Sequence, residues 1–111
     1  MVKKNAMVYH KLVRDRIPQI IAETGKKCTT QTLSEEEYLR FLDAKLTEEL
    51  AEYQQSKSLE ELSDLLEVME AVVKARGYRW EELTRIQAEK REKRGAFDRR
   101  ILLEEVFETQ E

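Results

Sequence analysis

The stretch KLTEELAEYQQSKSLEELSDLLEV, residues 45–68, decides the fold of this chain. Apolar residues recur every three or four positions on both sides of a short polar break, Ser56-Lys57-Ser58, as they do along amphipathic helices. Helices joined by so short a connection lie antiparallel and pack side by side. The stretch therefore predicts the closed end of a helical hairpin.

Four carboxylates of this hairpin are predicted to lie within its apolar faces. At about 100° per residue, Glu49 and Glu52 project among the apolar residues of the first helix. Glu61 and Asp64 do the same on the second helix. Glu48 projects to the margin of the apolar face and is the acid most easily explained as solvated. Charged groups seldom lie on apolar faces without a partner, and two i,i+3 carboxylate pairs suit a hard cation such as Mg²⁺, or Mn²⁺ as a substitute.

Each of these acids also has a structural explanation that the sequence leaves open. Glu61 follows Ser58 by three positions and can close a capping box at the start of the second helix. Glu49 or Glu52 can pair with Lys45 or with another cation. A di-iron site is disfavoured because such bundles use Glu-x-x-His motifs, and the one histidine lies outside the predicted helices. One Cys and one His also disfavour zinc.

Length and composition predict one globular domain. The 111 residues fit a single helical domain over residues 9–111, preceded by a loose N-terminus at residues 1–8. Charge is balanced, with 20 Lys+Arg against 23 Asp+Glu, so no nucleic-acid polymer is expected as a partner. No apolar run reaches the roughly 20 residues of a membrane span. A single cysteine, Cys28, favours a reducing compartment, so a cytoplasmic protein is expected.

The fold class expected from these patterns is all-α. It is a small helical bundle with a central antiparallel helix hairpin, and it is completed by oligomerisation, as a homodimer or homotetramer, because the hairpin has little core of its own. The remaining tail, residues 96–111, fits either a helical turn or an extended strip. The expected helices run from Pro18 to Gly25 with Asp15 as cap, over about residues 34–55 with a Ser34–Glu37 capping box, from Ser58 to Gly77, and from Trp80 to Arg94 with a stop at Gly95.

Two groups of basic residues are candidates for binding phosphate. Lys11 and Arg14 come just before the first helix, whereas Lys90 and Arg94 continue one face of the fourth helix to its C-terminus. The helix dipole alone favours cations at a helix C-terminus, and basic residues before a helix also coat surfaces. The physical pattern leaves both interpretations open.

Four segments in this order resemble a known superfamily: KLVRDRIP (11–18), KLTEELAE (45–52), ELSDLLEV (61–68) and KREKRGAF (90–97). Together they resemble the all-α nucleoside triphosphate pyrophosphohydrolases, the superfamily of MazG, dimeric dUTPase and phosphoribosyl-ATP pyrophosphatase. The two acidic segments look like its ExxE…ExxD metal motif, and the outer two look like a subgroup of small stand-alone proteins related to MazG. The interval between Glu52 and Glu61 is shorter than in many MazG proteins, so the hairpin turn must be tight.

The resemblance implies an enzyme that hydrolyses a nucleoside triphosphate to the monophosphate and pyrophosphate, with house-cleaning of the nucleotide pool as a role. Glu49 or Glu52 is the expected general base on the attacking water. A helical module that binds a partner protein without chemistry, or an inactive relative of the superfamily, is the alternative. The implied Mg²⁺ ligands are Glu49, Glu52, Glu61 and Asp64, and the implied phosphate contacts are Lys11, Arg14, Lys90 and Arg94.

Overall fold

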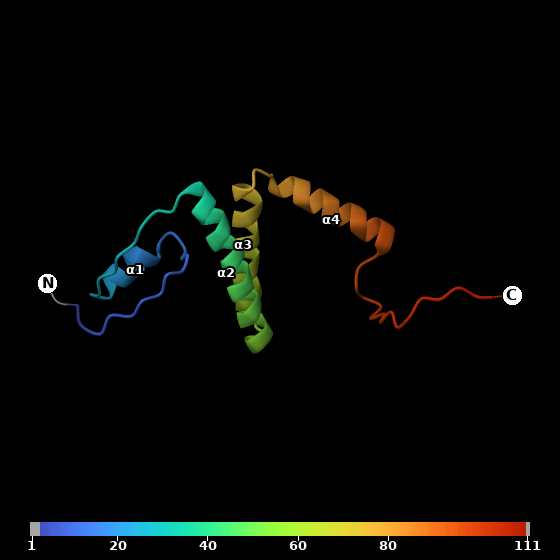
Figure 1. Ribbon diagram of the computed structural model, residues 1–111, viewed down its shortest axis with the longest axis horizontal. Coiled ribbons are helices and arrows are strands. Elements are labelled where there is room, and N and C mark those ends of the chain that lie inside the picture. Colours follow the sequence, from blue (N-terminus) through green and yellow to red (C-terminus); the bar gives the residue numbers. More distant parts are fainter. Residues whose placement is uncertain (1–2, 111) are drawn as a thin grey trace. The chain divides into compact units, whose positions relative to one another are not determined.

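The computed structural model describes residues 3–110, and it confirms the all-α prediction for that range (Figure 1). The described residues contain no strand, and none of their helices is long and apolar enough to cross a membrane. The chain divides into two compact units, the first up to Tyr78 and the second from Arg79 onward, and each is described by itself. The single domain over residues 9–111 stays a prediction. The helices are α1 Ile17–Glu23, α2 Glu35–Ser56, α3 Leu59–Ala75 and α4 Trp80–Arg94.

The predicted hairpin of α2 and α3 is the centre of the first unit. Among the described helices of this unit, only α2 and α3 pack together, and their two buried apolar side chains are Leu42, which is 2% exposed, and Val68, which is 9% exposed. The Ser34–Glu37 capping box that opens α2 is confirmed, because each side chain accepts a hydrogen bond from the backbone N–H of the other residue, at 3.2 and 3.4 Å. Such a small core leaves much of the hairpin surface uncovered.

The start of α3 differs from the sequence prediction in one respect that matters for the site. The Ser58 hydroxyl accepts a hydrogen bond from the Glu61 N–H at 3.3 Å, so Ser58 caps the helix. The Ser58 N–H, however, donates to the Ser56 hydroxyl at 3.2 Å. The capping box is therefore only half formed, and the Glu61 carboxylate is not used to close it.

The N-terminal part of the first unit corrects one prediction. Asp15 does not cap α1, because the helix begins at Ile17 and the capping position belongs to Arg16, whose side chain makes no capping hydrogen bond. Asp15 stands one position too early to reach the first turn. Residues 3–8 form no helix or strand and are exposed, while residues 1–2 lie outside the described range, so the loose N-terminus over residues 1–8 stays a prediction.

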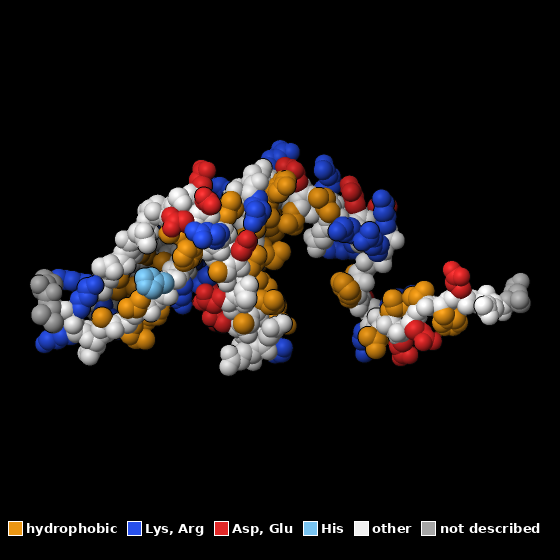
Figure 2. Space-filling view, in the orientation of Figure 1, with side chains coloured by type: hydrophobic (Ala, Val, Ile, Leu, Met, Phe, Trp, Pro, Cys, Tyr) orange, Lys and Arg blue, Asp and Glu red, His pale blue; other side chains and the backbone are white. Residues whose placement is uncertain are grey.

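The second unit consists of α4 and an extended segment. The helix has the predicted bounds, and it ends where Gly95, at φ +81°, donates its N–H to the Arg91 carbonyl at 2.8 Å. One turn follows, closed by the Arg100 N–H on the Phe97 carbonyl at 3.2 Å, and the remaining described residues form neither helix nor strand. Figure 2 shows apolar side chains along this segment, and the exposed ones are Phe97, Ile101, Leu102, Leu103, Val106 and Phe107.

Candidate metal centre

Glu49 is a buried carboxylate at the interface of the hairpin. It is 6% exposed, and its ligand atom lies within 4.8 Å of those offered by Glu61 and Asp64 from α3. The Oε2 atoms of Glu49 and Glu61 are shielded from solvent and have no hydrogen-bond partner among the described residues. A buried oxygen without a partner is costly. A divalent cation, which prefers carboxylate oxygens, fits these orphan atoms.

A second acidic group shares Glu49 with the first. The ligand atoms of Glu48, Glu49 and Glu52, all on α2, also lie within 4.8 Å of one another. Through Glu49, the two groups bring together the four carboxylates singled out from the sequence and add Glu48 as a fifth. Their role as metal ligands stays a prediction.

Glu48, at the margin of the apolar face, is partly exposed and is held by two lysines. Its side chain is only 31% exposed, and its Oε1 atom accepts from Lys45 at 3.3 Å and from Lys11 at 3.5 Å. Lys45 also lies 3.4 Å from Glu49 Oε1, so the anticipated pair between these two residues is confirmed. Lys11 precedes Glu48 by 37 positions, and no projection of a single helix reveals such a contact.

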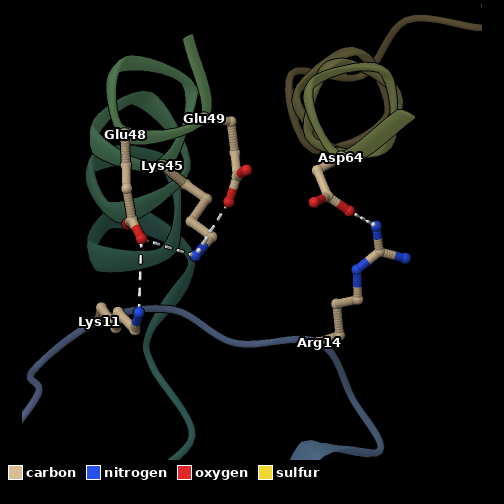
Figure 3. A network of polar contacts seen from close by, with 6 residues as sticks. All are labelled: Lys11, Arg14, Lys45, Glu48, Glu49 and Asp64. Carbon is tan, nitrogen blue, oxygen red and sulfur yellow. Dashed lines mark hydrogen bonds and ion pairs between the residues drawn. The ribbon is translucent and has the colours of Figure 1, made fainter. Parts of the chain in front are cut away.

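Two of the predicted phosphate-binding residues lie against the acidic cluster. Figure 3 shows Lys11 and Arg14 reaching from the segment before α1 toward the hairpin. The Arg14 Nη2 atom donates to Asp64 Oδ1 at 2.6 Å, while Lys11 contacts Glu48. The other two, Lys90 and Arg94, lie on the exposed surface of α4 in the second unit, so their contact with phosphate stays a prediction.

The environment of Glu49 changes its proton affinity. Burial is the main cause that raises the pKa of Glu49 above its ordinary value of 4.5, and the neighbouring Glu52 carboxylate raises it further. Lys45 acts in the opposite direction but does not offset the other two causes. The Glu49 side chain therefore holds its proton more tightly than a solvated glutamate does, because it is buried next to a second carboxylate.

Comparisons with known proteins leave the family undetermined. No protein-family model and no solved structure matches the chain. A stretch of 41 residues, 37% of this chain, is 56% identical to an uncharacterized protein of Mycolicibacterium smegmatis. The match spans 42% of that protein's length. Membership of the pyrophosphohydrolase superfamily is therefore an interpretation of the sequence segments and of the site.

Proposed function

We propose that the protein is a divalent-cation-dependent nucleoside triphosphate pyrophosphohydrolase, which releases pyrophosphate and a nucleoside monophosphate. The observation that carries this proposal is the pair of buried, unpartnered Oε2 atoms of Glu49 and Glu61, close to Asp64. Oxygen donors of this kind suit Mg²⁺ or Mn²⁺. The order of the four sequence segments supports the choice of reaction.

The carboxylates divide into two roles under this proposal. Glu49, Glu61 and Asp64 hold the cation, since their ligand atoms lie within 4.8 Å of one another across the two helices. Glu52, whose ligand atom lies near that of Glu49 on α2, is proposed to accept a proton from the attacking water. When bound, the cation would neutralise the charge on the phosphate oxygens.

A homodimer is part of the proposal because α3 exposes an apolar stripe. The side chains of the stripe are Leu59 at 81% exposure, Leu62 at 41%, Leu66 at 47% and Met69 at 37%. Their spacing of three, four and three positions is that of a coiled-coil seam, and an exposed apolar patch of this kind marks a protein interface.

The deciding experiment measures pyrophosphate release from a panel of canonical and modified nucleoside triphosphates with Mg²⁺. A Glu49→Gln, Asp64→Asn double variant should lose at least about 100-fold in rate, because it removes ligands for the cation that the reaction needs. A matched control, Glu67→Gln with Glu70→Gln, removes the same charge from exposed positions of α3 and should keep the activity. Silence of the folded wild type across the panel, or full activity of the double variant, would contradict the proposal.

A second candidate function is a protein-binding module without chemistry. The exposed apolar side chains of the C-terminal segment, such as Ile101, Leu102 and Phe107, favour it, because such patches commonly bind partners. Thermal unfolding distinguishes the two candidates. If the protein has a cation site, millimolar Mg²⁺ or Mn²⁺ raises the melting temperature, because the bound cation adds about 2.7 kcal/mol to the free energy of unfolding at a concentration 100 times the dissociation constant. A binding module gives the same melting temperature with the cation and with a chelator.

A further inference from the structure

Three carboxylates of the acidic cluster, Glu48, Glu49 and Asp64, have cationic partners, and two of these partners come from one loop. Arg14 lies 50 positions before Asp64 in the sequence and donates to its Oδ1 atom at 2.6 Å. Lys11, three positions earlier in the same segment, contacts Glu48 Oε1 at 3.5 Å. In Figure 3 both side chains extend from this segment onto the face of the hairpin that carries the acids.

A metal ion and these side chains compete for the same charges. A carboxylate oxygen that accepts a short hydrogen bond from a guanidinium is a poorer metal ligand, and the positive charge of Arg14 repels an approaching divalent cation. Asp64 therefore cannot serve both partners at full strength. A cation bound to Asp64 therefore weakens the contact with Arg14, and the contact with Arg14 weakens binding of the cation.

The exposure of the cations indicates which of them leave. The side chains of Lys11 and Arg14 are 43% and 56% exposed, and ion pairs at such positions are weak and easily exchanged with water. Lys45 is only 16% exposed and stands on α2 beside its acidic partners, so it stays in place. The two exchangeable cations thus belong to the segment before α1.

We propose that Lys11 and Arg14 are exchangeable counter-ions, which neutralise the carboxylates until a divalent cation displaces them and then bind the phosphates of the substrate. Arginine and lysine bind phosphate oxygens through charge-assisted hydrogen bonds, so the displaced side chains gain a new anionic partner. The second half of this inference rests on the proposed function. The first half concerns the metal alone and is tested separately.

The first test measures Mn²⁺ binding to the whole chain by calorimetry or electron paramagnetic resonance. Loss of a competing cation in Arg14→Ala should tighten Mn²⁺ binding by about two- to fivefold, the range expected for an exposed ion pair. The matched control is Arg76→Ala. Arg76 forms a similar ion pair with Asp43, at 3.0 Å and 46% side-chain exposure, and neither residue belongs to the metal-ligand groups, so its removal should change Mn²⁺ affinity far less.

The outcomes of this test separate the two proposals. Wild-type protein that binds no Mn²⁺ overturns both the metal centre and the exchange. If wild-type protein binds Mn²⁺ and Arg14→Ala binds it with the same or lower affinity, the exchange is overturned and the metal centre is retained. A second readout follows Arg14 itself: its Nε–H resonance in nuclear magnetic resonance spectra, assigned by its disappearance in Arg14→Ala, should shift as Mg²⁺ is added. A resonance that stays in place at saturation contradicts displacement.

The phosphate half of the proposal predicts an effect of opposite sign. With Mg²⁺ present, Arg14→Ala should bind a non-hydrolysable nucleoside triphosphate analogue about tenfold more weakly than wild type, because one charge-assisted contact is lost. Tighter metal binding together with weaker analogue binding is the signature of an exchanged counter-ion. The phosphate-binding role is contradicted if the variant binds both Mn²⁺ and the analogue more weakly, as loss of a merely structural contact would cause. It is also contradicted if analogue binding is unchanged.

Discussion

At the scale of single residues, Glu49 should give the metal-free protein a characteristic dependence on pH. Its raised pKa means that the folded protein binds this proton more tightly than the unfolded chain does. The resulting stability is fully present below the ordinary pKa of 4.5 and is lost as the pH rises through the raised value. Glu49→Gln cannot ionise, so its stability relative to wild type should increase as the pH rises above 4.5, by about 1.4 kcal/mol for each unit by which the pKa is raised.

Urea unfolding of both proteins at several pH values, with a chelator present, measures this difference. Glu70→Gln is the matched control, because it makes the same substitution at an exposed position of α3. A Glu49→Gln variant whose stability relative to wild type does not change with pH would show that burial leaves this carboxyl unperturbed.

The same residues show how far a sequence pattern predicts a site. Helical projection places Glu49 on an apolar face, and its burial follows from the packing of α2 on α3, which the hairpin pattern also predicts. The projection does not reveal the contact of Glu48 with Lys11, because Lys11 comes from a distant part of the chain. The contact of Arg14 with Asp64 is missed for the same reason. Periodicity describes one helix at a time, and contacts from a loop lie beyond its reach.

At the scale of helices, Ser58 is predicted to hold the turn of the hairpin. Two residues, Lys57 and Ser58, separate α2 from α3, and the Ser58 hydroxyl accepts the Glu61 N–H at 3.3 Å. Ser58→Ala leaves this N–H without its cap and should lower the free energy of unfolding by about 1 kcal/mol. Urea unfolding in a chelator measures the change.

Ser63→Ala makes the same substitution at an exposed position inside α3 and should leave stability unchanged or slightly higher, since alanine favours helices. Equal stability of Ser58→Ala and Ser63→Ala would contradict a capping role for Ser58.

The two capping motifs show where a sequence pattern fails to predict a hydrogen bond, because neighbouring groups compete for the same backbone N–H. The motif at Ser34 forms its full capping box, whereas the motif at Ser58 forms half of one, because the Ser56 hydroxyl takes the Ser58 N–H. The tight turn that brings Ser56 and Ser58 together is visible in the sequence, but which acceptor wins is not. The result leaves the Glu61 carboxylate available to the acidic cluster.

At the scale of the whole molecule, the small core explains why a second subunit belongs to the proposal. The sequence predicts the hairpin and its need for cover from chain length and periodicity. Among the described residues, the buried apolar side chains are Leu42 and Val68, fewer than a stable fold of this size ordinarily needs. What covers the remaining apolar surface depends on another molecule, and a single chain's periodicity does not identify it.

The homodimer can be tested at the centre of its proposed seam. Leu66→Glu places a charge in the exposed stripe of α3, and burial of that charge should shift the protein from dimer to monomer in sedimentation or light-scattering measurements. Ser63→Glu adds the same charge to an exposed position on the polar side of α3 and should remain a dimer. A monomeric wild type would contradict the dimer.

The monomeric variant also separates assembly from metal binding. The ligand atoms of Glu49, Glu61 and Asp64 come from one chain, so Leu66→Glu, if its circular dichroism spectrum remains helical, should still bind Mn²⁺. Loss of Mn²⁺ binding in a helical monomer would mean that the hairpin needs its partner to keep the carboxylates in place. Retention would mean that the two helices hold the ligand set by themselves, with the dimer serving to cover their apolar surface.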